Sequence, residues 1–586
     1  MAEIRVDRAR AAASVSPALF GGNMEVTRRT FWRGLSAELL ADRKFFSGTG
    51  DLPLGWQTAG AVSRKTDGVR AAMVFSGRGT LRQTCRQACL SAEKGYLFRV
   101  LITADAAFSL TLCMDGAPLA RLDGQPCRMA QHTLSVHLPA AMTEPQIEIS
   151  VDTAGTVRLH AVSLLPADHT DGLRPDAVAA LRSLSLSALR FPGGCYAEVY
   201  PWKDGLLPPD LRPPIRTDLY DGDFLLRDTY GYDPFDTDID AFMRLCAAVG
   251  AQPELTLPLI RLPLDDAADL VEYCRGGTDT PFGALRAERG HPAPYPVHEW
   301  YIGNEVYYFG GEMAQDGALA AEKTAALIRR VRAVDPDARL VLGFCAHRPE
   351  WTRAYLQRVG HLADRLSLHF YQTNEADKNF GRVTDAERAA VLADAFLPEL
   401  ARAEALVREL GLTDVPFSLD EWAYSWGEPG SPQSMITDTQ LLLWLMQNAD
   451  AHHIAKALYF HPVNEGLIRV GPQTTVLDLT GEVFCMASAL RGRPRLSCSA
   501  DGLPAAAAVQ GEDGAVLVMT ASVDCTADTP VRFSSPLFGG GARVTLRQLI
   551  ARADGTCEER VTTGTANEGF YLYPGAAALA VIRPED

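Results

Sequence analysis

The feature that most constrains the fold is an alternation of strand and helix patterns between about residues 171 and 464. Short apolar segments are followed by sequence whose apolar residues recur at helical spacing, such as Leu327, Val331 and Val334. With a segment near Phe20 the strand candidates number eight, and the other seven are 188–191, 253–257, 298–302, 340–343, 366–369, 417–420 and 457–460. Eight strands with intervening helices predict an α/β fold, a (β/α)8 TIM barrel. The main rival is an open doubly wound sheet, but no strand is followed by the GxGxxG turn of its dinucleotide-binding form.

The regions on either side of this alternation have the pattern of β-sandwiches. Between residues 55 and 165, segments such as Phe108–Leu112 and Ile147–Val151 alternate with period two between Gly, Pro and Asp turns. After residue 465 the helical patterns stop, and Val516–Met519 and Ala578–Ile582 are strand candidates. Between the first barrel strand and the insert we expect helical sequence, from Phe31 to Phe46.

These patterns divide the chain into four parts. We expect a strand in 1–17 that joins the C-terminal sandwich, and a catalytic barrel in 18–54 and 166–464. Residues 55–165 are predicted to form an inserted β-sandwich, and residues 465–586 a C-terminal β-sandwich.

Composition excludes several classes of function. The 586 residues carry a formal net charge of −16, which disfavours nucleic acid and anionic membrane surfaces as partners. No CxxC pair occurs among the 12 cysteines, so we expect no metal site, and nothing requires a cofactor. The N-terminal residues lack the apolar run of a signal peptide, and no stretch is apolar enough to span a membrane. A cytoplasmic protein with reduced thiols is expected.

Two of the strand candidates end in a carboxylate. Glu305 follows Trp300–Asn304, and Glu421 follows Val415–Asp420. Since the carboxyl ends of barrel strands meet at one face, we expect these two acids to converge to about 5 Å, on either side of one glycosidic bond. Taken alone, a Glu after a strand is as often a solvated surface residue.

Other polar residues also stand at predicted strand ends, which favours a site over an accident because buried carboxylates without a role are costly. They are Glu25, Arg190, Glu254, Asn304, His369, Tyr371, Asp420, His461 and Asn464.

Six motifs, in order along the chain, resemble the α-L-arabinofuranosidases of glycoside hydrolase family 51. They are Leu19–Glu25, Gly34–Arg43, Leu189–Cys195 with Trp202–Gly205, Ile302–Glu305, Ser367–Tyr371 and Asp420–Trp422.

The resemblance implies specific roles for the matching residues. Glu305 matches the acid/base of a retaining mechanism, and Glu421 matches its nucleophile. The expected substrate-binding residues are Glu25, Arg190, Cys195, Asn304, His369, Tyr371 and Trp422, together with Asn464 from the eighth strand. The inserted sandwich looks like the carbohydrate-binding-module-like insert of longer family members.

The sequence thus predicts a retaining exo-glycosidase that releases terminal α-L-arabinofuranosyl residues from oligosaccharides. One alternative is the same chemistry on another glycoside, such as a β-glucan, a xyloside or a galactofuranoside. A second is a non-catalytic carbohydrate-binding protein in which the insert binds the sugar. The expected partner is a carbohydrate substrate, and the family likeness suggests a homo-oligomer.

Overall fold

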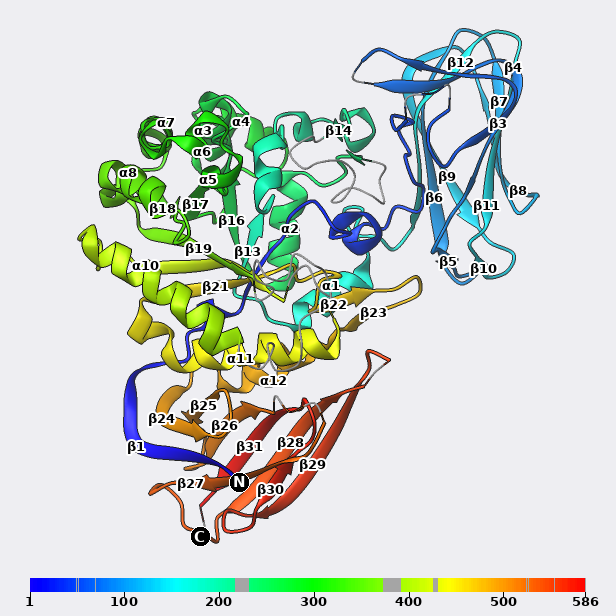
Figure 1. Cartoon of the computed structure of the whole chain (residues 1–586). Coiled ribbons are helices and arrows are strands. Elements are labelled where there is room, and N and C mark those ends of the chain that lie inside the picture. The colour runs from blue at the N-terminus through cyan, green and yellow to red at the C-terminus, as the bar shows by residue number, and fades with distance from the viewer. Residues whose placement is uncertain are drawn as a thin grey trace.

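In a computed structural model, the chain is described over residues 1–584, except 49, 51, 69, 217–230, 372–390, 425–429, 523, 525 and 553. Figure 1 shows a central barrel with a β domain on one side and a second β domain below it. Both ends of the chain lie in the lower β domain.

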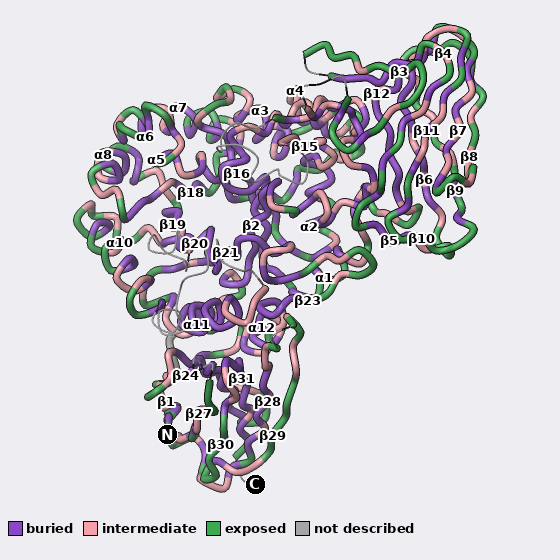
Figure 2. Tube along the Cα trace, turned by 45° about the vertical axis from the view of Figure 1, so that its right-hand side comes forward, coloured by how far each residue is buried: buried purple, intermediate pink, exposed green. Residues whose placement is uncertain are grey.

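The centre of the molecule is a closed barrel of eight parallel strands, as predicted. In barrel order its strands are β13 (Ala188–Phe191), β16 (Gln252–Leu257), β17 (Glu299–Ile302), β18 (Arg339–Gly343), β19 (Arg365–Tyr371), β20 (Phe417–Ala423), β21 (Ile454–Phe460) and β2 (Gly21–Asn23). These strands are buried almost throughout (Figure 2), because side chains fill the barrel inside and helices cover it outside. At Gly21 a Cβ would stand 2.1 Å from Leu458 Cδ2, so glycine lets β2 and β21 close the barrel.

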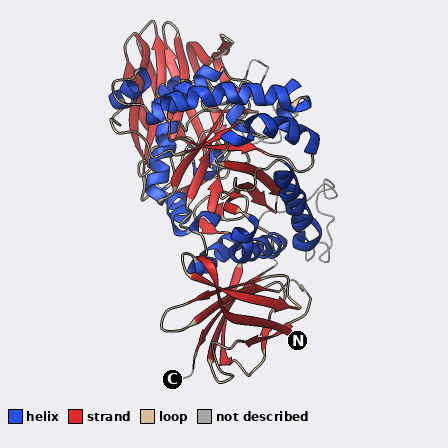
Figure 3. Cartoon of the chain, turned by 90° about the vertical axis from the view of Figure 1, so that its left-hand side faces the viewer, coloured by secondary structure: helices blue, strands red, loops and turns tan. Residues whose placement is uncertain are grey.

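Helices surround the barrel, as Figure 3 shows. They are α1 (Pro175–Ser183), α2 (Ile239–Val249), α3 (Leu264–Arg275), α4 (Pro281–Glu288), α5 (Val306–Phe309), α6 (Glu312–Gln315), α7 (Gly317–Val334), α8 (Pro349–Val359), α10 (Leu397–Glu409), α11 (Pro432–Asn448) and α12 (Leu479–Ala487). The expected helical spacing places Leu327 and Val331 of α7 in the barrel core. Within the described residues, no helix is long and apolar enough to cross a membrane.

The insert follows β2 and has a hydrophobic core of its own, separate from that of the barrel. Its main sheet contains β3 (Gln57–Thr66), β4 (Ala71–Thr84), β6 (Gly95–Ala104), β7 (Phe108–Met114), β8 (Ala117–Gly124), β9 (Cys127–His137), β11 (Gln146–Thr153) and β12 (Val157–Pro166). A small sheet pairs β5 (Cys89–Leu90) with β10 (Met142–Thr143). Two further small sheets border the barrel: β14 (Ile215–Arg216) with β15 (Tyr232–Asp233), and β22 (Ile468–Val470) with β23 (Thr475–Leu477).

The lower domain is built on a nine-stranded sheet. Its strands are β24 (Pro494–Asp501), β25 (Ala506–Gln510), β26 (Val516–Ala521), β27 (Thr529–Ser534), β28 (Arg543–Ala551), β29 (Cys557–Thr565), β30 (Phe570–Leu572), β31 (Ala577–Arg583) and β1 (Ala2–Ser14). Strand β1 lies between β24 and β27, antiparallel to the first and parallel to the second.

The expectation of helical sequence from Phe31 to Phe46 is wrong. The chain makes a single wide turn at Phe31–Leu35, inside which Trp32, Arg33 and Gly34 have non-helical backbone angles. Beyond it the Glu38 side chain accepts hydrogen bonds from the backbone N–H groups of Leu39 and Leu40. Local side-chain bonds of this kind compete with helix formation.

Candidate active site

Polar side chains on the barrel strands and in the loops after them meet at the carboxyl end of the barrel. The two acids singled out from the sequence both lie there, on β20 and directly after β17. One carboxylate oxygen of Glu305 and one of Glu421 lie within 4.8 Å of each other and of a His369 ring nitrogen. The expected convergence is therefore present in the structure.

Glu421 is buried among hydrogen-bond donors. Its Oε1 accepts from Arg190 Nη1 at 3.1 Å and from Asn23 Nδ2 at 3.3 Å. The hydroxyl of Tyr371 donates to Oε2. A guanidinium and two neutral donors together stabilise an anionic carboxylate and fix its orientation.

Glu305 has a different environment. It stands at a left-handed backbone position (φ 43°) before α5, an uncommon conformation for a residue other than glycine. Its Oε1 lies 2.8 Å from His369 Nδ1, and the Cys195 thiol lies 3.7 Å from Oε2. Within the described part of the chain, no Lys or Arg forms an ion pair with it.

His369 lies between the two acids, with Nδ1 3.4 Å from Glu421 Oε2 as well as close to Glu305. Burial by itself would lower the pKa of His369. The charges of Glu421 and Glu305, together with the hydrogen bond to Glu305, outweigh burial and raise that pKa to about 9. The imidazole is thus a cation near neutral pH.

Arg190 connects the strand ends. Besides Glu421, it donates to Asn304 Oδ1 at 2.7 Å and to Thr256 Oγ1 at 3.0 Å, and its guanidinium lies 4.2 Å from the Tyr301 ring centroid. The Asn304 amide in turn donates to Cys195 Sγ at 3.2 Å. Arg190, Asn304 and Cys195 therefore form one network around the acids.

Glu25 follows β2 and forms another wall of the site. Its carboxylate accepts from the Tyr196 backbone N–H at 2.8 Å and from Thr27 Oγ1 at 3.1 Å. Burial, and then the charge of Glu421, raise the pKa of Glu25 to about 7. Its own backbone N–H donates to His461 Nδ1 at 3.3 Å, which gives that histidine a structural contact.

The glycines before Cys195 let the backbone approach these carboxylates. A Cβ at Gly194 would stand 2.6 Å from Glu421 Oε1 and 3.4 Å from Glu25 Oε1. Glu421 and Glu25 thus border the same small space, which is kept open by the lack of a side chain at Gly194.

Two of the expected substrate-binding residues lie elsewhere. Trp422 packs against Tyr459 and Phe484, with ring centroids 5.1 and 6.1 Å away, because successive residues of β20 point to opposite sides. Asn464 binds backbone: its amide donates to the carbonyl oxygens of Arg29 and Arg33, and its oxygen accepts from Val470 N–H. Both assignments are corrected by these contacts.

The structure also adds residues that the sequence reasoning did not select for the site. Asn23 donates to Glu421, and Ser367 Oγ donates to Asp420 Oδ2 at 3.0 Å. Buried Glu198 accepts from Leu259 N–H at 2.8 Å and so supports the loop after β16. Asn23 could have been found, since it ends the short strand β2 and lies two residues before Glu25, so both side chains are expected to point to the same side.

Glu305, His369 and Glu421 offer atoms close enough together to hold a metal ion. Their contacts with one another and with Arg190 equally suit metal-free acid and base chemistry, so the expectation that no metal is used stays a prediction.

Comparison with known proteins points to one family. The family model described as "Alpha-L-arabinofuranosidase 1 domain" matches residues 180–388. An intracellular exo-alpha-L-arabinofuranosidase of Bacteroides ovatus is 28% identical over 278 residues, which cover 44% of this chain and 50% of that protein. An intracellular exo-alpha-(1->5)-L-arabinofuranosidase of Acetivibrio thermocellus is 25% identical over 261 residues, covering 43% and 49%. The chain thus spans about half the length of these curated relatives.

Two solved structures of α-L-arabinofuranosidases share the whole fold. An arabinose-bound α-L-arabinofuranosidase, MgGH51, superposes with a TM-score of 0.76 at 16% identity over 100% of both chains. The GH51 α-L-arabinofuranosidase of Thermotoga petrophila gives 0.66 at 16% identity, again over 100% of both chains. The matched domain, the curated relatives and the fold agree in their likeness to α-L-arabinofuranosidases, and the two solved structures with this fold are of family 51.

Proposed function

We propose that this protein is a retaining exo-glycosidase that hydrolyses terminal non-reducing α-L-arabinofuranosyl residues. The observation that carries the proposal is the pair of acids in unlike environments, Glu421 beside Arg190 and Glu305 beside His369, with carboxylate oxygens within 4.8 Å. Retaining glycosidases hold their two carboxyl groups about 5–5.5 Å apart, whereas inverting enzymes need about 6.5–9.5 Å to admit a water.

In the first step Glu421 attacks the anomeric carbon while a protonated Glu305 gives its proton to the departing oxygen. This forms a covalent glycosyl-enzyme. In the second step Glu305 removes a proton from water, which attacks the same carbon and releases Glu421 and the sugar. His369 contacts both acids, so its positive charge stays beside Glu305 while Glu305 loses its proton in the first step and regains one in the second.

The remaining polar groups are proposed to bind the sugar. Asn304 and Glu25 border the space in front of Glu421, and their oxygens and amide suit sugar hydroxyls. Arg190 and Tyr371 hold the nucleophile. The names of the relatives from Bacteroides ovatus and Acetivibrio thermocellus support arabinofuranose as the sugar and exo-action as the mode.

We also propose the domain organisation that the sequence predicts. We divide the chain into the barrel (18–54 and 166–464), the insert (55–165) and the C-terminal domain (465–586) joined by residues 1–17. A cytoplasmic location is supported by the word "intracellular" in the relatives' names, and by the lack of a disulfide among the described cysteines. A homo-oligomer is also part of the proposal and is measurable by light scattering.

The decisive experiment measures hydrolysis of 4-nitrophenyl α-L-arabinofuranoside, beside the β-D-xyloside, β-D-glucoside and β-D-galactofuranoside. We expect the arabinofuranoside to be preferred, and kcat to fall by several powers of ten in Glu421→Ala. Azide should restore turnover in this variant and yield an arabinosyl azide of inverted configuration. The matched control is Glu322→Gln, at an exposed position on α7, which leaves kcat unchanged.

Each alternative gives a distinct result. A preference for another glycoside would leave the proposed mechanism unchanged but would show that the substrate sugar is not arabinofuranose. Binding of arabino-oligosaccharide without hydrolysis would favour a carbohydrate-binding protein. Near-normal turnover in Glu421→Ala would refute the assignment of the nucleophile.

A further inference from the structure

Asp233 is a buried carboxylate that the proposed mechanism does not use. It ends the short strand β15 and is 8% exposed. Its Oδ2 accepts a hydrogen bond from the hydroxyl of Tyr196 at 2.6 Å, and its Oδ1 accepts one from the Phe235 backbone N–H at 2.9 Å. Burial raises the pKa of Asp233 to about 6, so the carboxylate is mostly ionised at pH 7. The bond from Tyr196 is therefore charge-assisted, which makes it stronger than one between neutral groups.

Tyr196 belongs to the 3₁₀ turn Cys195–Val199, which contacts both sides of the candidate active site. The thiol of Cys195 lies 3.7 Å from Glu305 Oε2, and the backbone N–H of Tyr196 donates to Glu25 Oε1 at 2.8 Å. The position of this turn therefore sets the orientation of the Glu25 carboxylate, which borders the proposed sugar site.

The chain enters the turn through glycines, which restrict its orientation little. A Cβ at Gly193 would stand 2.2 Å from Glu25 Cα, so only glycine lets the backbone pass this close to Glu25. Gly193 also has a positive φ of 101°. Because glycine permits many backbone angles, the orientation of the turn has to be fixed by contacts of its own side chains and of those after it.

Two tyrosine hydroxyls supply such contacts. Tyr196 donates to Asp233, and Tyr200, directly after the turn, donates to the Thr237 carbonyl oxygen at 3.1 Å. The bond to Asp233 is the shorter of the two, and it starts from the residue whose own N–H holds Glu25. The Tyr196 side chain is fully buried, so it does not reach the sugar itself. Any effect that it has on the reaction must pass through the turn.

The segment that carries Asp233 is held by the connection between the barrel and the insert. Lys44 donates to the Pro234 carbonyl oxygen, and Arg43 Nε donates to Asp236 Oδ2 at 3.1 Å. Arg43 and Lys44 are both buried, at the point where the chain leaves the barrel for the insert. The backbone on the C-terminal side of Asp233 is therefore fixed at two neighbouring positions.

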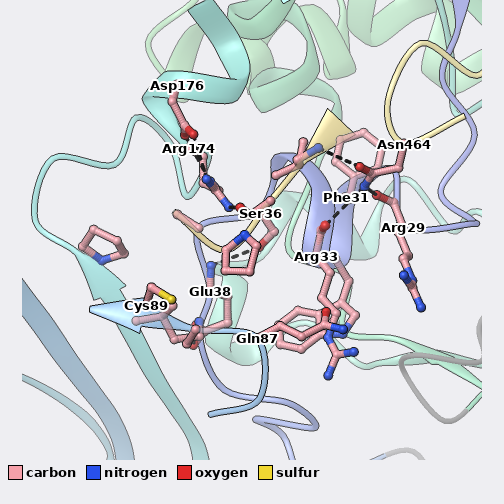
Figure 4. Close-up of a pocket in the computed structure, with 18 of the residues that line it drawn as sticks. Arg29, Phe31, Arg33, Ser36, Glu38, Gln87, Cys89, Arg174, Asp176 and Asn464 are labelled. Carbon is pink, nitrogen blue, oxygen red and sulfur yellow. Dashed lines mark hydrogen bonds and ion pairs between the residues drawn. The ribbon is translucent and has the colours of Figure 1, made fainter. Parts of the chain in front are cut away.

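The same connection borders a cavity of about 1120 Å³ between the barrel and the insert, whose barrel walls are the loops after β2, β13 and β21. Asp233 lines this cavity, and Glu38, labelled in Figure 4, lies on another wall. Glu38 accepts from the Leu164 backbone N–H at 2.9 Å and lies 3.9 Å from Arg43. It thus joins the connection that leaves the barrel to the strand that returns from the insert, which stiffens the support of Asp233.

We propose that Tyr196 is a positioning residue: its hydrogen bond to Asp233 fixes the 195–199 turn and thereby holds the Glu25 carboxylate against the terminal sugar. The inference rests on the proposed function, since it takes Glu25 as a group that binds a sugar hydroxyl. It also gives the connection between the barrel and the insert a role in sugar binding, through the segment that carries Asp233.

The first test removes the hydroxyl and keeps the ring. Tyr196→Phe should lower kcat/KM for 4-nitrophenyl α-L-arabinofuranoside about tenfold, mainly through KM, as expected for the loss of one hydrogen bond to a charged group. Asp233→Ala should cause a similar loss, and Asp233→Asn, whose amide oxygen still accepts a hydrogen bond, a smaller one. The double variant Tyr196→Phe/Asp233→Ala should be no worse than the more impaired single variant, because both substitutions remove the same contact.

The matched control is Tyr295→Phe. Tyr295 is also buried and also donates to a buried aspartate, Asp240, at 2.8 Å, but it lies before β17, at the end of the barrel away from the two acids. We expect Tyr295→Phe and Tyr196→Phe to lower the melting temperature by similar amounts, whereas Tyr295→Phe leaves kcat/KM unchanged. The comparison separates positioning from a general loss of stability.

Substrate analogues give a second readout, which a loss of stability alone would not move. They are the three monodeoxy forms of the nitrophenyl arabinofuranoside, each lacking one hydroxyl of the sugar. The analogue least affected by Glu25→Ala identifies the hydroxyl that Glu25 binds. The defect of Tyr196→Phe should fall to about twofold or less with that analogue and stay near tenfold with the others.

Unchanged kcat/KM in Tyr196→Phe, or an equal loss with all three analogues, overturns the proposal. If the wild type hydrolyses no arabinofuranoside, the proposed function fails, and the turn is tested by alkylation instead. Cys195 is 5% exposed, so its rate of reaction with iodoacetamide, located by mass spectrometry, reports on the position of the turn. Faster alkylation in Tyr196→Phe than in the wild type and in Tyr295→Phe supports the role of the hydrogen bond, and equal rates refute it.

Discussion

Two clusters of buried charge lie inside the same barrel, and they are built differently. In the lower cluster, Glu254 and Glu299 both contact Lys456, and Arg365 donates to Glu299 at 2.6 Å. At the mouth, Glu305, Asp420 and Glu421 share Arg190 and His369, and a fourth acid, Glu25, lies 3.9 Å from His461.

The ring of Tyr301 lies between the two clusters, 4.2 Å from the Arg190 guanidinium and 5.3 Å from Lys456 Nζ. Below the Tyr301 ring, two acids contact two bases, as expected of ion pairs whose attraction must offset the cost of desolvating each charge. Above it, acids are in excess, and burial raises the pKa of Glu25 and of Asp420. The imbalance, more than burial itself, distinguishes a site that can exchange protons from one that only holds strands together.

Within this comparison, the largest expected effect is that of removing Arg190 from the mouth. Arg190→Met should lower kcat by about 10²–10³-fold, since Glu421 loses its guanidinium and Asn304 its donor. Initial rates with the nitrophenyl arabinofuranoside measure this. A loss below fivefold would mean that catalysis does not depend on the Arg190 guanidinium.

The matching substitution below is Lys456→Met. It leaves Glu254 and Glu299 without their shared ammonium, so we expect the free energy of unfolding to fall by about 3–5 kcal/mol. The kcat of the folded fraction should stay within about threefold of wild type. Urea denaturation and active-site titration separate the two quantities, and a variant that folds normally but is inactive would contradict the division into two clusters.

The next effect concerns pH. Because the pKa of His369 is raised from 6.5 to about 9, its charged form stabilises the fold fully below pH 6.5. That contribution, on the order of 3 kcal/mol, is lost as pH rises through 9. The difference in unfolding free energy between wild type and His369→Gln should therefore shrink from pH 6 to pH 9.5. Parallel stability curves over this range would be inconsistent with a histidine that bridges two carboxylates.

The smallest effect is expected at Trp422, next to the proposed nucleophile. Trp422→Phe should change kcat/KM by less than about twofold and cost about 1 kcal/mol of stability, because it trims a packed ring in the core. Within the described residues, its buried indole N–H has no hydrogen-bond partner to lose. Steady-state kinetics and thermal denaturation test this. A tenfold loss of activity would show that Trp422 does contribute to substrate binding.

The barrel and its two acids could be predicted because they depend on local patterns. An apolar run ending in a carboxylate locates Glu305 and Glu421, and strand geometry brings them together. The period of two along β20 also explains the error at Trp422, since a residue adjacent to an inward carboxylate must point outward.

Other parts could not be predicted because their cause is distant in sequence. The helix expected at Phe31–Phe46 is replaced by a turn whose carbonyl oxygens bind Asn464, more than four hundred residues later. The cavity likewise needs the insert and three barrel loops in their final places. The hydrophobic periodicity of a single segment does not predict such long-range contacts.

The place of β1 between β24 and β27 has a consequence for biosynthesis. In a chain emerging from the ribosome, β1 has no strand to pair with until residues 494–534 have been translated. During most of elongation it must therefore be kept from pairing with other chains. Deleting residues 2–14 should leave two unpaired strand edges in the middle of the lower sheet. The truncated protein should therefore aggregate on refolding, even though its barrel residues are unchanged.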